Sequence, residues 1–441
     1  MISCHTRTLS NGLRLVAVEM PHLHSAEIAV YIKVGGRNDP PDKAGLSHFL
    51  EHMLFRGTAE FQTSLALETA FESIGGSVNA ATDEESTCFF SRVHPSFVAE
   101  SVRLFASMML RPILAGIDLE KRIITEEALE DINEQGEEIN PHNLASRLLW
   151  PNHPLGMPTI GFLPTIGSFT EADLRQHLAN YYVPTNAVLV VVGEIKAEEV
   201  YSSCAAEYHG WQGQKAPLQL SPVNPQLRPQ SIFVKDSDSQ VHLLVNFRGF
   251  ARNDHRIMAT RLLRRILCGS GSSRLHLALR ERLGIVYSVD AAISAYEETG
   301  SFAIELSTSP KNLPQAVAEV LAATGLLASE PVPQEELQRI KQGYFFDLEF
   351  SRDSTYEMQV RYGWGELMGL ARRLDDDRDE ADALDSAALQ TTAVELFAPA
   401  NLNLVLVGPW EAKGRRKVDK IVADYEKKWS SISRSDQESV S

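Results

Sequence analysis

The stretch Y-V-P-T-N-A-V-L-V-V-V-G, residues 182–193, has a counterpart in F-A-P-A-N-L-N-L-V-L-V-G, residues 397–408. The spacing between them is 397 − 182 = 215 residues. A second pair keeps this spacing, because residues 25–39 and residues 240–254 both end in Arg-Asn-Asp. Two matches in one register, near opposite ends of a unit of roughly 200 residues, indicate a duplicated domain.

Hydrophobic periodicity within each copy predicts both strands and helices. Residues 27–34 and 241–247 alternate between apolar and polar side chains, as strands do. Residues 65–74, 96–110 and 170–182 have helical spacing instead. Since strands and helices do not alternate regularly along the chain, we expect an α+β fold, with helices packed on a mostly antiparallel sheet in each copy.

The domain boundaries follow from a proline-rich segment. Residues 212–230 contain four prolines, which exclude a regular helix or a central strand, so this segment is the predicted linker. We therefore expect a first domain over residues 1–211 and its duplicate over residues 231–429. Residues 430–441 are polar and are expected to be a disordered tail.

Composition limits the classes of function. The 441 residues are too many for one ordinary core, and 44% hydrophobic with 23% charged residues is typical of a globular protein. A net charge of −16 disfavours nucleic acid or an anionic membrane as partner; it favours cationic partners, or it serves solubility alone. The apolar runs are too short for a bilayer helix, and no secretory signal is evident, so we expect a cytoplasmic protein. The four scattered cysteines favour neither a disulfide framework nor a cysteine zinc site.

Polar residues interrupt an apolar helical pattern in A-G-L-S-H-F-L-E-H-M-L-F-R-G-T, residues 44–58. His48 and His52 are four residues apart and share one helix face with Glu51, a spacing that suits zinc. A third ligand must come from elsewhere. Adding 215 to the positions of this trio gives aliphatic residues, so the fold does not require polar side chains there and a functional role is indicated: Leu263, Ile266 and Leu267.

Further stretches strengthen one resemblance. T-L-S-N-G-L-R-L-V at residues 8–16, G-G-S-V-N-A at residues 75–80 and N-H-P-L-G-M-P-T-I-G at residues 152–161 accompany the histidine motif. Together they resemble the inverted-motif zinc peptidases, the family of pitrilysin, insulin-degrading enzyme and the mitochondrial processing peptidase. The resemblance covers nearly the whole chain and implies a zinc peptidase with one zinc ion per chain.

The resemblance also implies a third ligand. The family carries a glutamate on a later helix with a second glutamate seven residues before it, which correspond here to Glu127 and Glu120. Two helical turns separate these residues, so both lie on one face, and Glu120 is expected to orient a histidine. Glu126 is the rival ligand. In the second copy the two positions become Glu335 and Gln342.

Catalytic roles follow from the same resemblance. Zinc lowers the pKa of a bound water to about 7, and Glu51 is the expected base that takes its proton. Arg280 and Tyr287 match a pair that contacts substrate or the transition state, where they would stabilise the carbonyl oxygen. Asn79 and Ala80 would present backbone groups to an extended substrate by strand addition.

Assembly and substrate stay as alternatives. The resemblance implies a zinc-dependent endopeptidase that cleaves peptides or unfolded segments inside a chamber made by two chains. A homodimer is expected, and a heterodimer with a metal-free paralogue stays open. Other readings are a non-catalytic or partner-dependent subunit of a processing peptidase, and a maturation protease dedicated to one precursor peptide. The acidic balance favours basic peptide substrates.

Overall fold

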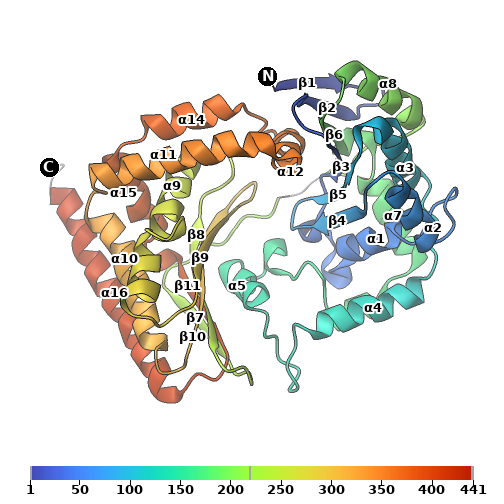
Figure 1. Cartoon of the computed structure of the whole chain (residues 1–441). Helices are drawn as coiled ribbons and strands as arrows, with labels where there is room; N and C mark the ends of the chain where they lie inside the picture. Colours follow the sequence, from blue (N-terminus) through green and yellow to red (C-terminus); the bar gives the residue numbers. More distant parts are fainter. Residues whose placement is uncertain (1, 218–219, 439–441) are drawn as a thin grey trace. The chain divides into compact units, whose positions relative to one another are not determined.

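The computed structural model of the chain describes residues 2–217 and 220–438, with side chains up to residue 429. The chain forms two compact units, and each is assembled from separate segments (Figure 1). Unit 1 contains Met1–Leu129, Met157–Gln219 and Asp347–Leu374. Unit 2 contains Glu130–Gly156, Leu220–Phe346 and Asp375–Ser441.

The sheet of unit 1 has the strand order β1-β2-β6-β3-β5-β4. β2 and β6 are parallel, whereas the other neighbouring strands are antiparallel. β4 is the last strand at one edge among the described residues. The strands are β1 (Ser3–Thr8), β2 (Arg14–Glu19), β3 (Ala26–Ile32), β4 (Val78–Thr82), β5 (Thr87–Val93) and β6 (Ala187–Gly193).

The sheet of unit 2 repeats this plan with the strand order β7-β11-β8-β10-β9. β7 and β11 are parallel, as β2 and β6 are, and the remaining pairs are antiparallel. The strands are β7 (Gln230–Val234), β8 (Val241–Gly249), β9 (Val289–Ala295), β10 (Gly300–Thr308) and β11 (Leu402–Val407). The structure confirms the predicted α+β class with two related, mostly antiparallel sheets.

Helices lie between and after the strands in both halves of the chain. In the first half of the chain they are α1 (Leu46–Leu54), α2 (Ser64–Ser73), α3 (Val98–Leu110), α4 (Ile117–Leu129), α5 (Pro141–Leu149), α6 (Leu163–Ser168), α7 (Glu171–Tyr181) and α8 (Ala197–Tyr208). In the second half they are α9 (Ile257–Cys268), the π-helix η6 (His276–Arg282), α10 (Leu313–Ser329), α11 (Gln334–Phe350), α12 (Thr355–Gln359), the π-helix η8 (Val360–Trp364), α13 (Gly365–Met368), α14 (Leu374–Ala383), α15 (Ser386–Leu396) and α16 (Ala412–Glu438).

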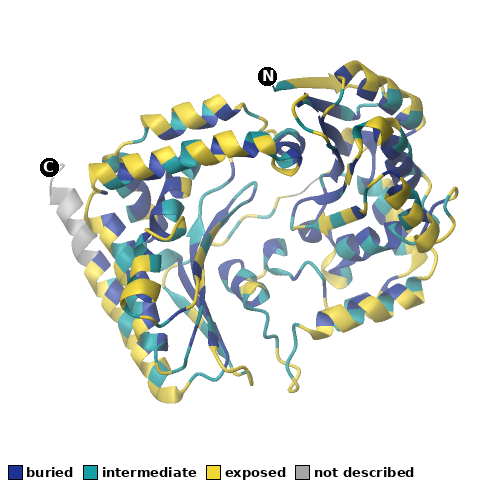
Figure 2. Ribbon diagram, viewed as in Figure 1, coloured by how far each residue is buried: buried dark blue, intermediate teal, exposed yellow. Residues whose placement is uncertain are grey.

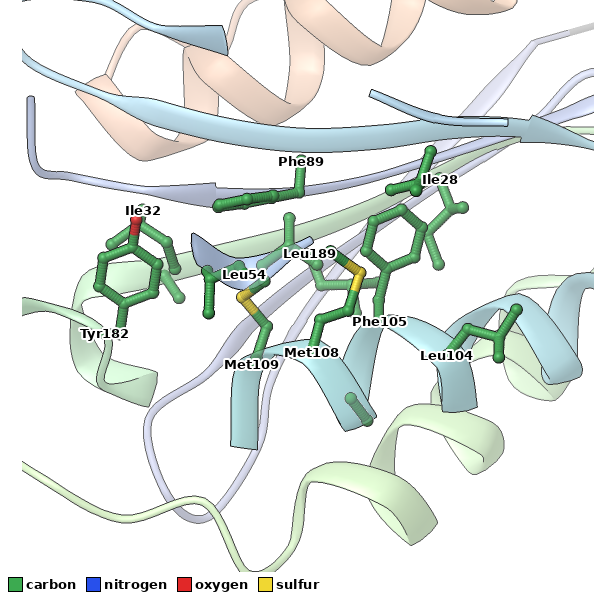
Figure 3. Packing of buried hydrophobic residues seen from close by; sticks show 14 of the residues in the cluster. Ile28, Ile32, Leu54, Phe89, Leu104, Phe105, Met108, Met109, Tyr182 and Leu189 are labelled. Atoms are coloured by element: carbon green, nitrogen blue, oxygen red, sulfur yellow. The ribbon is translucent and has the colours of Figure 1, made fainter. Parts of the chain in front are cut away.

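Aromatic and aliphatic side chains fill the core of unit 1 between its sheet and its helices. Phe105 and Met108 of α3 face the strands, where Phe89 of β5 meets them (Figure 3). Phe105 also lies edge-on to Phe71 of α2, with ring centroids 5.2 Å apart. Each such buried side chain stabilises the fold by about 1.5–3 kcal/mol. The buried strands appear dark blue in Figure 2, whereas the exposed helix faces are yellow.

Each sheet is covered on its other face by a helix from the opposite half of the sequence. α12 packs on β3 and β6 of unit 1, where Thr355 Oγ1 donates to Glu27 Oε2 at 3.1 Å. α5 packs on β8 and β11 of unit 2, where Leu144 joins Val405 in a buried cluster. The predicted division at residues 212–230 places α5 in the first domain and α12 in the second, whereas α5 belongs to unit 2 and α12 to unit 1. Tertiary contacts between distant segments, which the sequence does not show, decide this exchange of helices.

The ends of the regular elements fit the sequence analysis in part. Between α8 and β7 the described residues form neither helix nor strand, in keeping with the proline-rich segment. α16 continues to Glu438 and so includes most of the polar tail that was expected to be disordered; residues 439–441 lie outside the described residues. Among the described residues, no helix combines the length and apolar content that crossing a bilayer requires.

Candidate metal centre

The helix α1 begins at a fixed point because the carboxylate of Asp39, six residues before Gly45, caps it. Gly45, with φ of 94°, precedes the helix, and its backbone N–H donates to Asp39 Oδ2 at 3.0 Å. The backbone N–H and the hydroxyl of Ser47 donate to Asp39 Oδ1 at 3.1 and 2.7 Å. Burial raises the pKa of Asp39 to about 7, against the opposing effect of these hydrogen bonds. The cap satisfies N–H groups that a helix start leaves without partners.

Three side chains of unit 1 converge on one point. His48 Nε2 lies 3.6 Å from Glu127 Oε1, and His52 Nε2 lies 3.8 Å from Glu127 Oε2. One ligand atom from each of the three residues lies within 4.8 Å of the others. Ligands placed tetrahedrally at about 2.1 Å from a zinc ion are about 3.4 Å apart. Two imidazole nitrogens and a carboxylate oxygen at these separations fit zinc in both chemistry and size.

The pKa values of the two histidines are shifted in opposite directions. Burial lowers the pKa of His48 to about 4, and the neighbouring His52 adds to this effect. His48 is therefore held in the neutral form, which is the form that binds metal. Burial also lowers the pKa of His52, but the hydrogen bond and charge of Glu120 outweigh it, so that the pKa is raised overall.

Glu120 orients His52 from behind. Its Oε1 lies 2.9 Å from His52 Nδ1, so the remaining ring nitrogen, Nε2, faces Glu127. Arg56 Nε donates to the other oxygen of Glu120. Burial acts to raise the pKa of Glu120, but the hydrogen bonds from His52 and Arg56 lower it by more than burial raises it. The pKa is therefore lowered overall, and this carboxylate is ionised at neutral pH. Glu126, the rival ligand, is exposed and does not belong to the cluster.

Glu51 lies on the same helix but outside the ligand cluster. Its side chain is buried, and Oε2 accepts a hydrogen bond from Thr82 Oγ1 at 2.5 Å. Burial raises the pKa of Glu51, whereas the bond from Thr82 opposes this shift. A carboxylate of raised pKa beside the ligand cluster is suited to accept and return a proton.

Sequence reasoning missed several of these supporting residues. Arg56 follows His52 by four residues and could have been inferred from helical spacing. Thr82 gives no such signal, because its contact with Glu51 depends on α1 lying beside β4. Asp39 and Ser47 lie eight residues apart in a segment without regular helical spacing, so their contact also required the structure.

β4 carries the two residues predicted to bind an extended substrate. Asn79 and Ala80 lie on this edge strand, and Asn79 is exposed with Nδ2 donating to the carbonyl of Ser77 at 3.3 Å. The strand pairs only with β5 among the described residues, so its other edge has backbone groups for strand addition. The same strand ends at Thr82, the hydrogen-bond donor to Glu51.

Arg280 and Tyr287 lie in unit 2, where the structure brings them together. The guanidinium carbon of Arg280 lies 5.6 Å from the centre of the Tyr287 ring. Tyr287 is 86% exposed. Arg280 Nη1 lies 3.3 Å from His276 Nε2, one turn earlier on η6; sequence reasoning did not identify this neighbour.

Family profiles match both halves of the chain. Residues 14–161 match the profile described as insulinase, peptidase family M16, and residues 168–344 match the one described as peptidase M16 inactive domain. An uncharacterized zinc protease, YmxG, of Bacillus subtilis is 30% identical over 411 residues, which cover 91% of this chain and 97% of that protein. An uncharacterized zinc protease of Mycobacterium leprae is 27% identical over 93% of this chain and 92% of its own length.

Solved structures have the same fold. A protease from Helicobacter pylori superposes with a TM-score of 0.85 at 22% identity, covering 93% of this chain and 100% of that one. An M16 inactive domain from Pseudomonas fluorescens superposes with a TM-score of 0.84 at 19% identity, covering 93% of this chain and 99% of that one. These likenesses agree with the profiles and with the Bacillus relative: the chain belongs to the M16 family of peptidases, the family of pitrilysin and insulinase.

Proposed function

We propose that the chain is a zinc-dependent endopeptidase that cleaves peptides or unfolded segments. The observation that carries this proposal is the convergence of His48, His52 and Glu127 beside a buried carboxylate, Glu51, that takes no part in the cluster. A zinc ion held by these three residues would act as a Lewis acid toward the scissile carbonyl and toward a water molecule. The residues of the chain then supply the proton transfers and the substrate contacts.

Glu51 is the proposed general base. It takes the proton of the attacking water and delivers it to the leaving amine, so its carboxylate must stay close to the ligands without being one of them. Thr82 fixes one oxygen of this carboxylate through its hydroxyl, which leaves the other oxygen for the water. Because burial raises the pKa of Glu51, the protonated form that donates to the amine is more accessible than in an exposed glutamate.

Substrate contacts are assigned to the edge strand and to unit 2. An extended peptide would pair with β4 at Asn79 and Ala80. Arg280 and Tyr287 would stabilise the negative charge that develops on the carbonyl oxygen, acting in the same chain or from a partner chain. We propose that two chains form the closed chamber as a homodimer, and that basic peptides are preferred because the chain carries a net charge of −16. A cytoplasmic location is part of the same proposal.

Metal content and turnover test the proposal together. The wild type should contain one zinc per chain by elemental analysis and should lose cleavage of a mixed peptide library after chelation. Glu51→Gln should keep the zinc and lose turnover by a factor of at least about 100, the contribution expected of a general base. Glu126→Gln, on an exposed neighbour of a ligand, is the matched control and should keep both properties.

The outcomes separate the competing readings. Zinc binding without hydrolysis of any library peptide would favour a non-catalytic or partner-dependent subunit. Cleavage of one precursor sequence alone would favour a dedicated maturation protease. A heterodimer predicts that light scattering on the purified chain shows a monomer that gains activity only when a paralogue is added. Equal turnover by the wild type and Glu51→Gln would contradict the proposal.

A further inference from the structure

Helix α9 of unit 2 is the counterpart of the metal helix α1 of unit 1. In each copy the helix follows the strand that lies third from the β4 or β9 edge, and the next strand along the chain is that edge strand. α1 contacts β4, and α9 contacts β9. The two helices therefore occupy equivalent places in related folds.

Burial sets the register between these helices. α1 buries Leu46, Ser47, Phe49, Leu50, Glu51, Met53 and Leu54. α9 buries Met258, Ala259, Thr260, Leu262, Leu263, Ile266 and Leu267. At an offset of 259 − 46 = 213 residues the two patterns coincide at six positions and differ at Glu51, whose counterpart Arg264 is half-buried. Leu46 lies 46 − 39 = 7 residues after Asp39, whereas Ala259 lies 259 − 254 = 5 residues after Asp254.

This register corrects the equivalences taken from the spacing of 215 residues. The prediction that Leu263, Ile266 and Leu267 stand in place of the metal trio is wrong, since these residues face the core of unit 2. The true counterparts of His48, Glu51 and His52 are three arginines, Arg261, Arg264 and Arg265. The second copy thus has three positive charges on the helix face that carries the candidate metal ligands in the first copy.

The three arginines line a cavity of unit 2. Its volume is about 410 Å³, and the other described lining residues come from β9 and α11. α11 is the counterpart of α4, the helix that carries Glu127 in unit 1. The cavity therefore lies where the metal centre lies in the first copy. The complete lining is Arg261, Arg264, Arg265, Ala291, Ala292, Ile293 and Tyr344.

Backbone and ring contacts hold the guanidinium groups at the cavity. Arg264 Nη1 donates to the carbonyl of Ala291, on edge strand β9, at 3.2 Å. The guanidinium carbon of Arg265 lies 5.8 Å from the centre of the Tyr344 ring. Arg261 Nη1 lies 4.0 Å from Asp377 Oδ1, which is at the limit of an ion pair. These contacts position the groups without bringing an acidic residue into the described lining of the cavity.

Such a concentration of positive charge favours an anion. Three guanidinium groups that share a cavity can attract one anion together, in addition to the contacts that they make within the chain. Guanidinium groups match the paired oxygens of carboxylate and phosphate with two parallel hydrogen bonds. The cluster does not reflect a generally basic surface, because the chain has 58 acidic and 42 basic residues.

We propose that this cavity binds a multiply charged oxyanion, through phosphoryl or carboxylate groups contacted by Arg261, Arg264 and Arg265. Unit 2 would then keep a ligand site at the position of the metal centre, with the sign of the ligand's charge reversed. The proposal does not rest on the peptidase function, since binding can be measured without cleavage.

Site-resolved arginine labelling tests the proposal on the full-length wild-type chain. Phenylglyoxal labelling, quantified by mass spectrometry, is compared without anion, with pyrophosphate and with triglutamate at equal ionic strength. We expect pyrophosphate or triglutamate to slow the labelling of the three cavity arginines at least threefold relative to labelling without anion. Arg416, exposed on α16, should be labelled at an unchanged rate. Protection by pyrophosphate identifies a phosphate compound as the source, and protection by triglutamate identifies an acidic peptide.

Calorimetric titration of variants provides the second measurement. The double variant Arg264→Gln, Arg265→Gln should bind the protecting anion at least tenfold more weakly than the wild type. Arg416→Gln removes the same kind of charge from a distant exposed position and should bind normally. Circular dichroism checks the fold, and the labelling of the wild type remains decisive if the double variant does not fold. Absence of protection by both anions would overturn the proposal, as would equal binding by the double variant and the wild type.

Discussion

The Nδ1 atom of His52 lies 2.9 Å from Oε1 of Glu120, a contact that leaves Nε2 of the same ring facing Glu127. A carboxylate behind a ligating histidine fixes its tautomer and raises its basicity. Glu120→Gln should therefore weaken zinc affinity by about 10–100-fold. Competition with a chromophoric chelator measures this change. Affinity equal to that of the wild type would show that Glu120 serves packing alone.

The choice between adjacent glutamates on α4 gives a second prediction. Glu127→Gln should lose stoichiometric zinc, because it removes the anionic ligand that faces both histidines. Glu126→Gln changes the neighbouring exposed residue in the same chemical way and should keep one zinc per chain. Elemental analysis of both variants after gel filtration decides the matter, and the opposite pattern would make Glu126 the ligand.

The aspartates of the repeated Arg-Asn-Asp motif should respond oppositely to pH. Burial raises the pKa of Asp39 to about 7, so its contribution to stability is complete below its unfolded pKa and is lost as the pH rises to about 7. The hydrogen bond from Arg256 and its charge, against a smaller effect of burial, lower the pKa of Asp254 to about 2. The contribution of Asp254 is therefore complete above its unfolded pKa and is lost as the pH falls toward 2.

Denaturant unfolding in the presence of a chelator measures this contrast. The stability of the wild type relative to Asp39→Asn should decrease between about pH 4 and pH 7. Relative to Asp254→Asn it should stay constant over that range and decrease only below it. Parallel pH profiles for the two variants would contradict the assignment.

A glycine at the start of the metal helix gives a fourth prediction. Gly45 has φ of 94°, and a β-carbon there would collide with the carbonyl oxygen of Ile160. Gly116 has a similar φ of 82°, but a β-carbon there would meet no atom within 4 Å. Gly116→Ala should cost about 1–2 kcal/mol of unfolding free energy from backbone strain alone. Gly45→Ala should cost more than this and should also weaken zinc binding, since α1 must shift. Equal costs in denaturant unfolding would exclude the collision.

Sequence alone determined the duplicated α+β fold, because hydrophobic alternation and repeated turn residues are local signals that survive in both copies. It also predicted a metal site at His48 and His52 with Glu51 beside them, since their spacing along a single helix is fixed by helical geometry. The position of Glu127 rested on resemblance, and the structure places this residue beside both histidines.

Tertiary structure decided what depends on contacts between distant segments. The exchange of α5 and α12 between the two units, and the contact of Thr82 with Glu51, leave no periodic trace in the sequence. The same is true of the register between α1 and α9. A constant spacing of residues cannot reveal a two-residue deletion in a loop, whereas burial can, because only one register places apolar side chains in both cores.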